Sequence, residues 1–254
     1  MSVYIVDYGY HGEVVDELAD YVDSVAVEDA DTILVIGGDG SMLRAIDELR
    51  VLGKPFFGIN RGTRGFLLNN LDDLSGIEEA MASVKTERLW QLEGTVVFED
   101  GSSEVFEAFN DIWVERASGQ SLKARIWIND FEDPSPLMSG DGILFSTPQG
   151  STGYNRSANG KVVPLNVDAL QVTPLHMMVN KVKTTSMLFN FDYGFRITMD
   201  ERLKRPARVF FDQTCVGDKG VAELLVKRSA STVGLQMVSC NSFIEKTLDW
   251  QLHR

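Results

Sequence analysis

Short apolar runs alternate with helical patterns along the first third of the chain. Three runs are rich in β-branched or other apolar residues, as buried parallel strands are: residues 3–6, 32–36 and 55–59. Two segments between them repeat apolar residues at helical spacing: residues 11–22, and a second one with Leu43, Ile46 and Leu49 on one side. Ser41 is the expected cap of that second helix. Strands separated by helices predict an α/β domain with a parallel sheet over residues 1–88.

From about residue 89 the pattern changes to short strands separated by turn-forming residues. The strand-like runs are residues 91–98, 105–113, 122–128, 143–146, 196–199, 207–211, 222–227 and 232–238. Helical spacing recurs only around residues 167–170. The pattern therefore predicts an all-β domain over residues 89–239.

Composition and charge narrow the class of protein. With 44% hydrophobic residues in 254, the chain can build a full core. Lys and Arg number 24 against 37 Asp and Glu, a formal net charge of −13. A nucleic-acid partner is not expected, because such proteins carry basic stripes. No apolar run is long enough to span a membrane, and the first residues do not resemble a secretion signal. We expect a cytoplasmic protein with Cys215 and Cys240 as reduced thiols.

The first loop that suggests chemistry follows the second predicted strand. Gly37, Gly38 and Gly40 allow a sharp turn and a close approach of the backbone to a ligand. The start of the next helix offers unpaired N–H groups and a positive dipole end, which suit phosphate. Asp39 would repel the same anion, unless it faces a hydroxyl to be deprotonated or positions a metal ion. The alternative is a tight turn capped by Asp39.

Two further loops have binding chemistry. The first of them reads Asn60-Arg61-Gly62-Thr63-Arg64-Gly65-Phe66-Leu67. Its arginines can bind phosphate and Phe66 can stack on a flat ring, but taken alone the loop is better explained as a polar surface loop with Phe66 in the core. The other, residues 141–160, is rich in Ser, Thr, Gly and Asn, which can bond to ribose and base edges. Asp141 can accept a hydrogen bond from an exocyclic amine; the alternative is a surface loop.

Taken in order, these segments resemble the NAD kinase family over about residues 33–215. The matching motifs are the GGDG segment at 37–40, the N-x-G-x-x-G-F-L segment at 60–67, Asn110-Asp111 for an Asn-Glu pair, and the D-G-x-x-x-S-T-P-x-G-S-T-A-Y segment at 141–154. The resemblance implies transfer of the terminal phosphate of ATP, another triphosphate or polyphosphate to the 2′-hydroxyl of the adenosine ribose of NAD. It also implies a divalent metal ion, with Mg²⁺ expected.

The resemblance implies an architecture as well. It predicts a Rossmann-like α/β domain, a β-sandwich-like domain and an active site between them, with residues 240–254 returning to pack on the first domain. Family members are usually homodimers or homotetramers in which a neighbouring subunit helps to complete the NAD pocket. We expect the same here.

Individual roles follow from the same resemblance. Asp39 would be the catalytic base. NAD would contact Asp39, Gly40, Phe66, Asn110, Asp111, Asp141, Thr152, Gly153, Tyr154 and Ser157. The donor phosphates would contact Gly37, Gly38, Gly40, Ser41, Asn60 and Arg61. No residue is assigned to a metal, and the histidines, His11, His176 and His253, are expected to be incidental because their spacing matches no metal motif.

Departures from the family pattern leave the proposed base in place. Asp111 stands for the usual glutamate, Gly153 for alanine, and residues 159–161 for Gly-Gly-Pro, while residues 212–214 also differ. Two other readings remain. A lipid or sphingoid-base kinase would rest on the GGDG segment alone, and a sensor would bind NAD or NADP without turnover.

Overall fold

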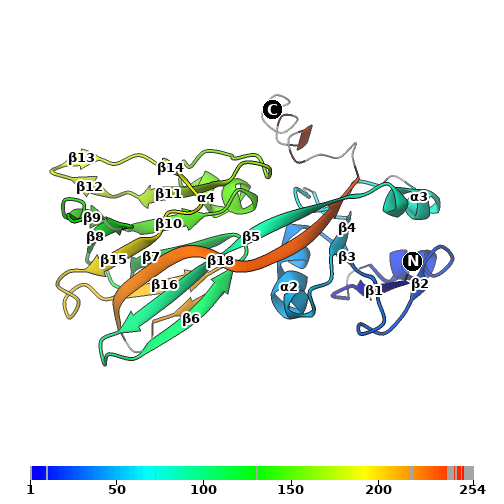
Figure 1. The fold of residues 1–254 in the computed structure, drawn as a ribbon, viewed down its shortest axis with the longest axis horizontal. Coiled ribbons are helices and arrows are strands. Elements are labelled where there is room, and N and C mark those ends of the chain that lie inside the picture. Colours follow the sequence, from blue (N-terminus) through cyan, green and yellow to red (C-terminus); the bar gives the residue numbers. More distant parts are fainter. Residues whose placement is uncertain are drawn as a thin grey trace. The chain divides into compact units, whose positions relative to one another are not determined.

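The computed structural model describes residues 2–9, 11–63, 65–71, 73–129, 131–217, 220–238, 243, 245, 246 and 248. The chain divides into two compact units: residues 1–89 with 232–254, and residues 90–231 (Figure 1). Both boundaries lie inside long strands, β5 (Lys85–Phe98) and β18 (Val221–Met237). Arg64, Cys240 and His253, singled out in the sequence, lie outside the described residues, as does most of the segment expected to return from residue 240. Cys215 is an exposed free thiol.

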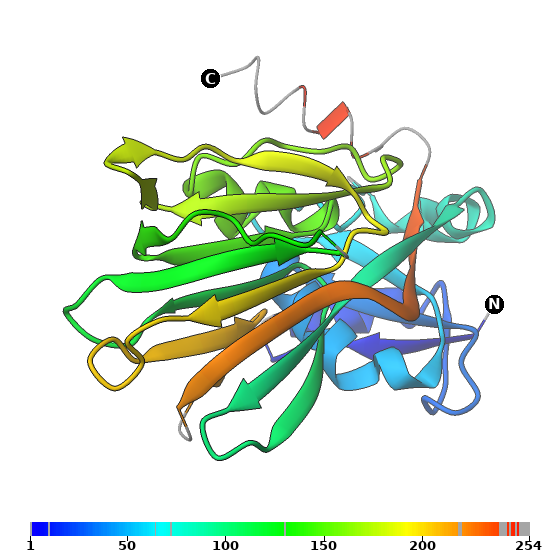
Figure 2. The ribbon, with the colours of Figure 1, turned by 60° about the vertical axis from the view of Figure 1, so that its left-hand side comes forward.

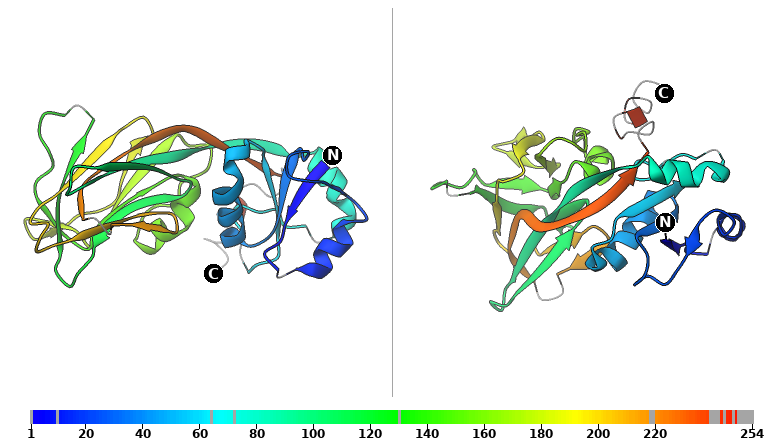
Figure 3. Two further views of the ribbon diagram at one scale, coloured as in Figure 1. Left: turned by 90° about the horizontal axis from the view of Figure 1, so that it is seen from below. Right: turned by 45° about the vertical axis from the view of Figure 1, so that its right-hand side comes forward.

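The first unit is a parallel sheet covered by helices. Its strands, in sheet order after the end of β18, are β4 (Phe56–Asn60), β3 (Thr32–Gly37), β1 (Ser2–Val6) and β2 (Asp23–Ser24). Its helices are α1 (Gly12–Leu18), α2 (Asp39–Leu49) and α3 (Ile77–Ala82), with 3₁₀ turns at Arg50–Leu52 and Leu74–Gly76. Figure 3 shows α2 on one side of the strands and α1 and α3 on the other. Because β3 is covered on both faces, its apolar residues are buried along its whole length.

The start of α2 differs from the prediction. The N-cap is Gly38, α2 begins at Asp39, and no side chain caps it, so the expected cap at Ser41 is wrong. The Ser41 side chain instead packs under Gly37: a Cβ on Gly37 would lie 2.4 Å from Ser41 Oγ. Gly37 also has a φ of +146°, a conformation that side-chain-bearing residues rarely adopt. The glycine therefore lets the chain turn directly from β3 into α2.

The second unit is built from two packed sheets. One is antiparallel, in the order β14 (Met187–Asn190), β11 (Ala169–Leu175), β10 (Gly142–Ser146), β7 (Asp111–Arg116), β16 (Ala207–Phe211) and β17 (Thr214–Val216). The other runs β13 (Val182–Lys183), β12 (Met178–Val179), β9 (Met138–Gly140), β8 (Leu122–Ile128), β15 (Phe195–Met199) and β18, with β5 and β6 (Ser103–Ala108) beside it. They lie face to face over one apolar core (Figure 2). The predicted fold class, a parallel α/β domain followed by a β-sandwich-like domain, is confirmed.

Three strand predictions are corrected by the structure. The run 105–113 is two strands, β6 and β7, because side chains capture the peptide groups at Phe109 and Asn110. The runs 222–227 and 232–238 are one strand, β18, whose polar middle finds partners: Arg228 pairs with Asp192 at 2.6 Å. The segment 167–170, where helical spacing recurs in the sequence, leads into β11, which begins at Ala169. The helical turns described in this unit are Gln149–Thr152 and α4 (Tyr154–Ser157). None of the described helices is long and apolar enough to cross a membrane.

Candidate active site

Asp39 is the first residue of α2, directly after the glycine turn that ends β3. Its carboxylate accepts hydrogen bonds from two backbone N–H groups of the next loop, Phe66 at 3.1 Å and Leu67 at 2.9 Å. Burial raises the pKa of Asp39, and these two bonds and the charge of Lys246 oppose the rise. The structure thus holds a carboxylate in a fixed orientation at the end of a parallel strand, with its pKa moved toward neutrality.

Lys246 is part of the same environment and has no signal in the local sequence. Its Nζ donates to the carbonyl oxygens of Gly65, at 2.8 Å, and Leu68, which lie 181 and 178 positions away in the chain. Burial lowers the pKa of Lys246 to about 8, and nearby Asp39 opposes that fall. Asp39 and Lys246 are therefore an interacting acid and base, both within the first unit.

The predicted phosphate contacts Asn60 and Arg61 shape their own loop. Asn60 Nδ2 donates to Asn70 Oδ1 at 2.8 Å, and its Oδ1 accepts from the backbone N–H of Gly62 at 3.0 Å. The Arg61 guanidinium donates to the carbonyl oxygen of Asn60 at 2.9 Å. In this conformation both side chains hold the loop that follows β4.

Phe66 occupies the position of a core side chain. It is 8% exposed, and its ring lies 6.0 Å from that of Phe243. Phe66 contacts the glycine loop through its backbone N–H, which donates to Asp39. The core reading of Phe66 therefore describes the structure better than stacking on a ligand.

In the second unit a sharp turn presents Asn110 and Asp111. The Asp212 carboxylate accepts from three successive backbone N–H groups, those of Phe109 at 2.7 Å and of Asn110 and Asp111 at 2.9 Å each. Thr147 Oγ1 donates to the carbonyl oxygens of Phe109 and Asn110, at 3.0 Å in both cases. The side chains that directly follow β16 and β10 thus fix the Asn-Asp pair where β7 begins.

Asn110 and Asp111 carry buried acceptors without partners. Within the described part of the chain, Asn110 Oδ1 and Asp111 Oδ1 are buried and make no hydrogen bond. Asp111 is 4% exposed, and this burial raises its pKa well above the ordinary value; the charge of Asp212 adds to the rise, whereas a bond from Ser146 opposes it. Unpaired buried acceptors are costly, and a ligand with hydroxyl donors would satisfy them.

The long third loop is fixed by Asn155. Asn155 Nδ2 donates to Gln171 Oε1 at 2.8 Å, and its Oδ1 accepts from Thr173 Oγ1 at 2.6 Å. A Cβ on Gly160 would lie 2.1 Å from Asn155 Oδ1, so this position of the family's Gly-Gly-Pro stretch still requires glycine here. Beside the buried Asn155, Tyr154 and Ser157 of α4 are exposed.

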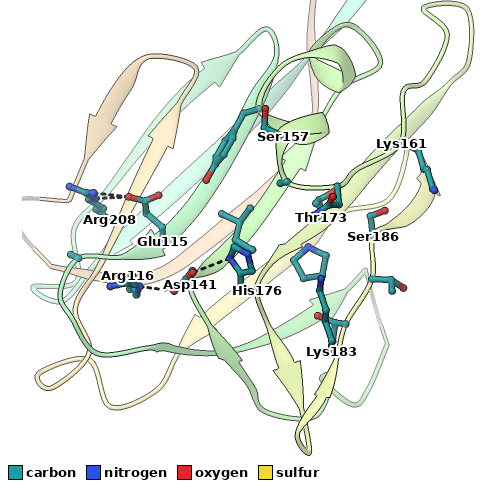
Figure 4. Close-up of a pocket in the computed structure, with 18 of the residues that line it drawn as sticks. Glu115, Arg116, Asp141, Ser157, Lys161, Thr173, His176, Lys183, Ser186 and Arg208 are labelled. Atoms are coloured by element: carbon teal, nitrogen blue, oxygen red, sulfur yellow. Dashed lines mark hydrogen bonds and ion pairs between the residues drawn. The ribbon is translucent and has the colours of Figure 1, made fainter. Parts of the chain in front are cut away.

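A cavity of about 770 Å³ lies in the second unit (Figure 4). Three predicted NAD contacts line it: Asp141, Tyr154 and Ser157. The residues of the Asn-Asp pair and Thr152 and Gly153 are not in its lining. Most of the other lining residues were not predicted as site residues, among them Glu115, Arg116, His176 and Arg208. Arg208 pairs with Glu115 at 2.7 Å, so the cavity wall is strongly polar.

Asp141 is already bonded on both oxygens. Arg116 Nε donates to Oδ1 at 2.7 Å, and His176 Nδ1 lies 3.1 Å from Oδ2. The bond from Arg116 holds the pKa of Asp141 below its ordinary value. His176, expected to be incidental, thus lies beside a predicted site residue. Strand register is the signal that would have found it: Leu175 pairs with Gly142, so the residues next to them, His176 and Asp141, meet.

The fold and the two sites define a protein of two units, one with a glycine loop and a half-buried acid, the other with unpaired buried acceptors and a polar cavity. The chain belongs to the ATP-NAD kinase family. The profile of the ATP-NAD kinase N-terminal domain matches residues 5–87, and that of the ATP-NAD kinase C-terminal domain matches residues 92–209.

Similar curated proteins are named NAD kinase. The NAD kinase of Rickettsia africae is 37% identical over 168 residues, 65% of this chain and 64% of the relative. That of Rickettsia bellii is 40% identical over 166 residues, 64% of this chain and 62% of the relative. The matched region therefore spans less than two thirds of these relatives.

Solved structures share the fold at low identity. The yeast NADH kinase complexed with NADH superposes with a TM-score of 0.80 at 19% identity, covering 99% of this chain and 87% of the other. An Archaeoglobus fulgidus NAD kinase in complex with ATP superposes with a TM-score of 0.76 at 21% identity, covering 97% of this chain and 98% of the other. At these identities the likeness establishes the fold.

Proposed function

We propose that the protein is an NAD kinase that transfers the terminal phosphate of ATP to the 2′-hydroxyl of the adenosine ribose of NAD, yielding NADP. The observation that carries the proposal is the Asp39 carboxylate: half-buried, oriented by two backbone N–H groups and raised in pKa at a glycine turn. Membership of the ATP-NAD kinase family supports the same reaction.

The donor phosphates are assigned to the glycine turn and the start of α2. The backbone N–H groups of Gly38, Gly40 and Ser41 lie at the first turn of an 11-residue helix, where unpaired N–H groups and the helix dipole favour anions. Mg²⁺ would enter bound to the donor phosphates, as part of the substrate, and would neutralise their charge. Across the described residues, no cluster of three or more His, Cys, Asp or Glu side chains could hold a metal ion by itself.

The acceptor ribose is assigned to Asn110 and Asp111. Ribose hydroxyls are donors, and the two unpaired oxygens of this pair are acceptors. The rest of the dinucleotide is assigned to the cavity with Asp141, Tyr154 and Ser157. The contacts of Gly40, Phe66, Thr152 and Gly153 with NAD stay predictions from the family resemblance.

Asp39 acts as the base in this proposal. A carboxylate has about four lone-pair positions, so the two N–H bonds to Asp39 leave room to accept a hydroxyl proton. The raised pKa makes it a better base than an exposed aspartate, and Lys246 favours its ionised form. In a loose transition state the hydroxyl loses its proton late, so a modest base suffices.

Assembly and location are part of the proposal too. A homodimer or homotetramer and a cytoplasmic location stay predictions from the sequence. So does the choice among ATP, another triphosphate and polyphosphate as donor.

The test is NADP formation by the purified protein with NAD, ATP and Mg²⁺, coupled to an NADP-specific dehydrogenase. We expect steady product with ATP or polyphosphate. Tight NAD binding without product from any donor would contradict the proposal and favour the sensor. Phosphorylation of a lipid or sphingoid base in place of NAD would contradict it as well.

A further inference from the structure

Three side chains form a hydrogen-bonded chain on the wall of the cavity: Arg116, Asp141 and His176 (Figure 4). Arg116 comes from the end of β7, Asp141 precedes β10, and His176 follows β11. The backbone fixes the same arrangement, because Asp141 N–H donates to the Leu175 carbonyl and Arg116 N–H to the Asp141 carbonyl, both at 2.9 Å. The three side chains are therefore positioned by three neighbouring, hydrogen-bonded strands.

The hydrogen bonds among these three side chains determine which nitrogen of His176 carries the proton. Asp141 is held ionised by Arg116 and can only accept, so the proton of neutral His176 lies on Nδ1, 3.1 Å from Asp141 Oδ2. The other nitrogen, Nε2, is then an acceptor. Nε2 has no hydrogen-bond partner in the described part of the chain, and the His176 side chain is 78% exposed at the cavity wall.

The arrangement also gives Asp141 two partners within the protein. Both of its oxygens are already engaged, by Arg116 and by His176. A ligand amine that approached Asp141 would compete with a charge-assisted bond at 2.7 Å from Arg116. The Nε2 atom of His176 is an acceptor that this wall offers to a ligand.

From this geometry we infer that His176 is a specificity-determining residue that accepts a hydrogen bond from an amino group of the bound dinucleotide, with Asp141 as the positioning residue that fixes its tautomer. The inference rests on the proposed function, because it takes NAD as the occupant of the cavity. NAD carries two such groups, the 6-amino group of adenine and the carboxamide of nicotinamide.

The experiment measures, by calorimetry, the binding of NAD and of two analogues that each lack one amino group. Nicotinamide hypoxanthine dinucleotide has a carbonyl in place of the adenine amine, and acetylpyridine adenine dinucleotide has a methyl in place of the carboxamide nitrogen. We expect the wild-type protein to prefer NAD over one of them by about 3- to 10-fold, the range of one hydrogen bond. The analogue that loses affinity identifies the group that is read.

His176→Asn tests the histidine directly. The backbone of His176 has a φ of +51°, which asparagine adopts readily, and the asparagine side chain is too short to reach the position of Nε2. We expect this variant to bind NAD and the discriminated analogue equally. If the variant prefers NAD over both analogues as strongly as the wild-type protein does, the inference is overturned.

Asp141→Asn tests the tautomer, which a merely structural role would not affect. Its oxygen would accept from Arg116 and its amide would donate to His176 Nδ1, so Nε2 would carry the proton and become a donor. The preference for the amine is then lost, and, if adenine is the group read, the hypoxanthine analogue binds more tightly than NAD. An unchanged preference in a folded variant would contradict the role of Asp141.

The matched control is Lys181→Gln. Lys181 is exposed at the turn between β12 and β13 and does not line the cavity, so its variant should keep the wild-type preference. Failure of the inference is distinct from failure of the proposed function. A wild-type protein that forms NADP and binds NAD without discriminating either analogue overturns the inference alone, whereas one that binds no NAD overturns both.

Discussion

Two aspartates with raised pKa values, one in each unit, differ in how the protein compensates for their burial. Asp39 accepts two backbone N–H bonds and lies near the charge of Lys246. Asp111 is buried more completely, has an oxygen with no partner in the described residues, and feels the like charge of Asp212. The first carboxylate is stabilised by the protein itself, while the second is left with an unmet acceptor.

This difference suggests different uses for two residues of the same type. A carboxylate with a fixed orientation and a compensated charge suits a step that recurs at every turnover, such as accepting a proton. A buried acceptor without a partner suits ligand binding, because the ligand supplies the missing donor. The comparison therefore supports the proposed roles of Asp39 as the base and of Asp111 as a contact of the ribose.

The largest expected effect is on turnover in Asp39→Asn. Removal of a general base lowers kcat by roughly 10²- to 10⁴-fold. Asp73→Asn is the control, because the Asp73 side chain also accepts a backbone N–H, from Ser75 at 2.9 Å, in an exposed turn of the same unit. The NADP assay should show near-normal kcat for Asp73→Asn. Equal losses in both variants would remove Asp39 from the chemistry.

Gly150→Ala should disrupt the Asn-Asp pair. A Cβ at this position would lie 2.4 Å from the Asn110 carbonyl oxygen and 2.8 Å from Asp111 Oδ1. Overpacking of this kind costs about 1–3 kcal/mol of unfolding free energy, and NAD affinity should fall as the acceptors move. Gly153→Ala is the control, since its nearest contact would be 3.3 Å from the Gly150 carbonyl. Urea unfolding that finds the two variants equally stable would contradict this packing.

Asp111→Asn should flatten the dependence of stability on pH. Because the pKa of Asp111 is raised in the folded state, its contribution to stability is fully present below the ordinary value of 3.8 and is lost as pH rises through the folded pKa. The wild-type protein should therefore lose stability relative to Asp111→Asn as pH rises toward neutrality. Thermal unfolding between about pH 5 and 8 measures this; parallel curves would mean that the Asp111 carboxyl is not buried as a charged group.

The smallest effect is expected for Lys246→Met. Loss of this cation raises the pKa of Asp39 further, so the acidic limb of the kcat profile should move to higher pH. Lys54→Met is the control: Lys54 donates to the backbone carbonyls of Glu28, at 2.8 Å, and Ala30, and its charge is not among the causes of the Asp39 pKa shift. Its profile should match the wild type. A Lys246→Met profile that also matches would separate Lys246 from Asp39.

The local patterns of the sequence were sufficient for the strands and loops of the first unit. The buried run of β3 and the glycines after it show in a short window, since covered parallel strands are continuously apolar. The break at Asn110 could not be seen in this way, because the carboxylate that causes it, Asp212, lies 102 positions further along. Residues 228–231 look like a turn in the sequence because they are mostly polar. The partners that keep them in a strand, such as Asp192, come from elsewhere in the chain.

The candidate sites divide in the same way. Asp39, Asn110, Asp111, Asp141, Tyr154 and Ser157 stand in motifs, so they could be named from the sequence. Lys246 and His176 stand in none, because they reach the sites through packing and strand register. Asn60, Arg61 and Phe66 stand in a motif as well, but in this structure they hold the loop and the core.

The most direct test of the division between the two aspartates is the dissociation constant of NAD for Asp39→Asn, measured by calorimetry beside its turnover. Asparagine offers only one acceptor to the N–H groups of Phe66 and Leu67, so some loss is expected. We expect NAD to bind within about 3-fold of the wild-type affinity while kcat falls by at least about 100-fold. A dissociation constant that rises as much as kcat falls would contradict it, and would make Asp39 a support for the loop and the binding site.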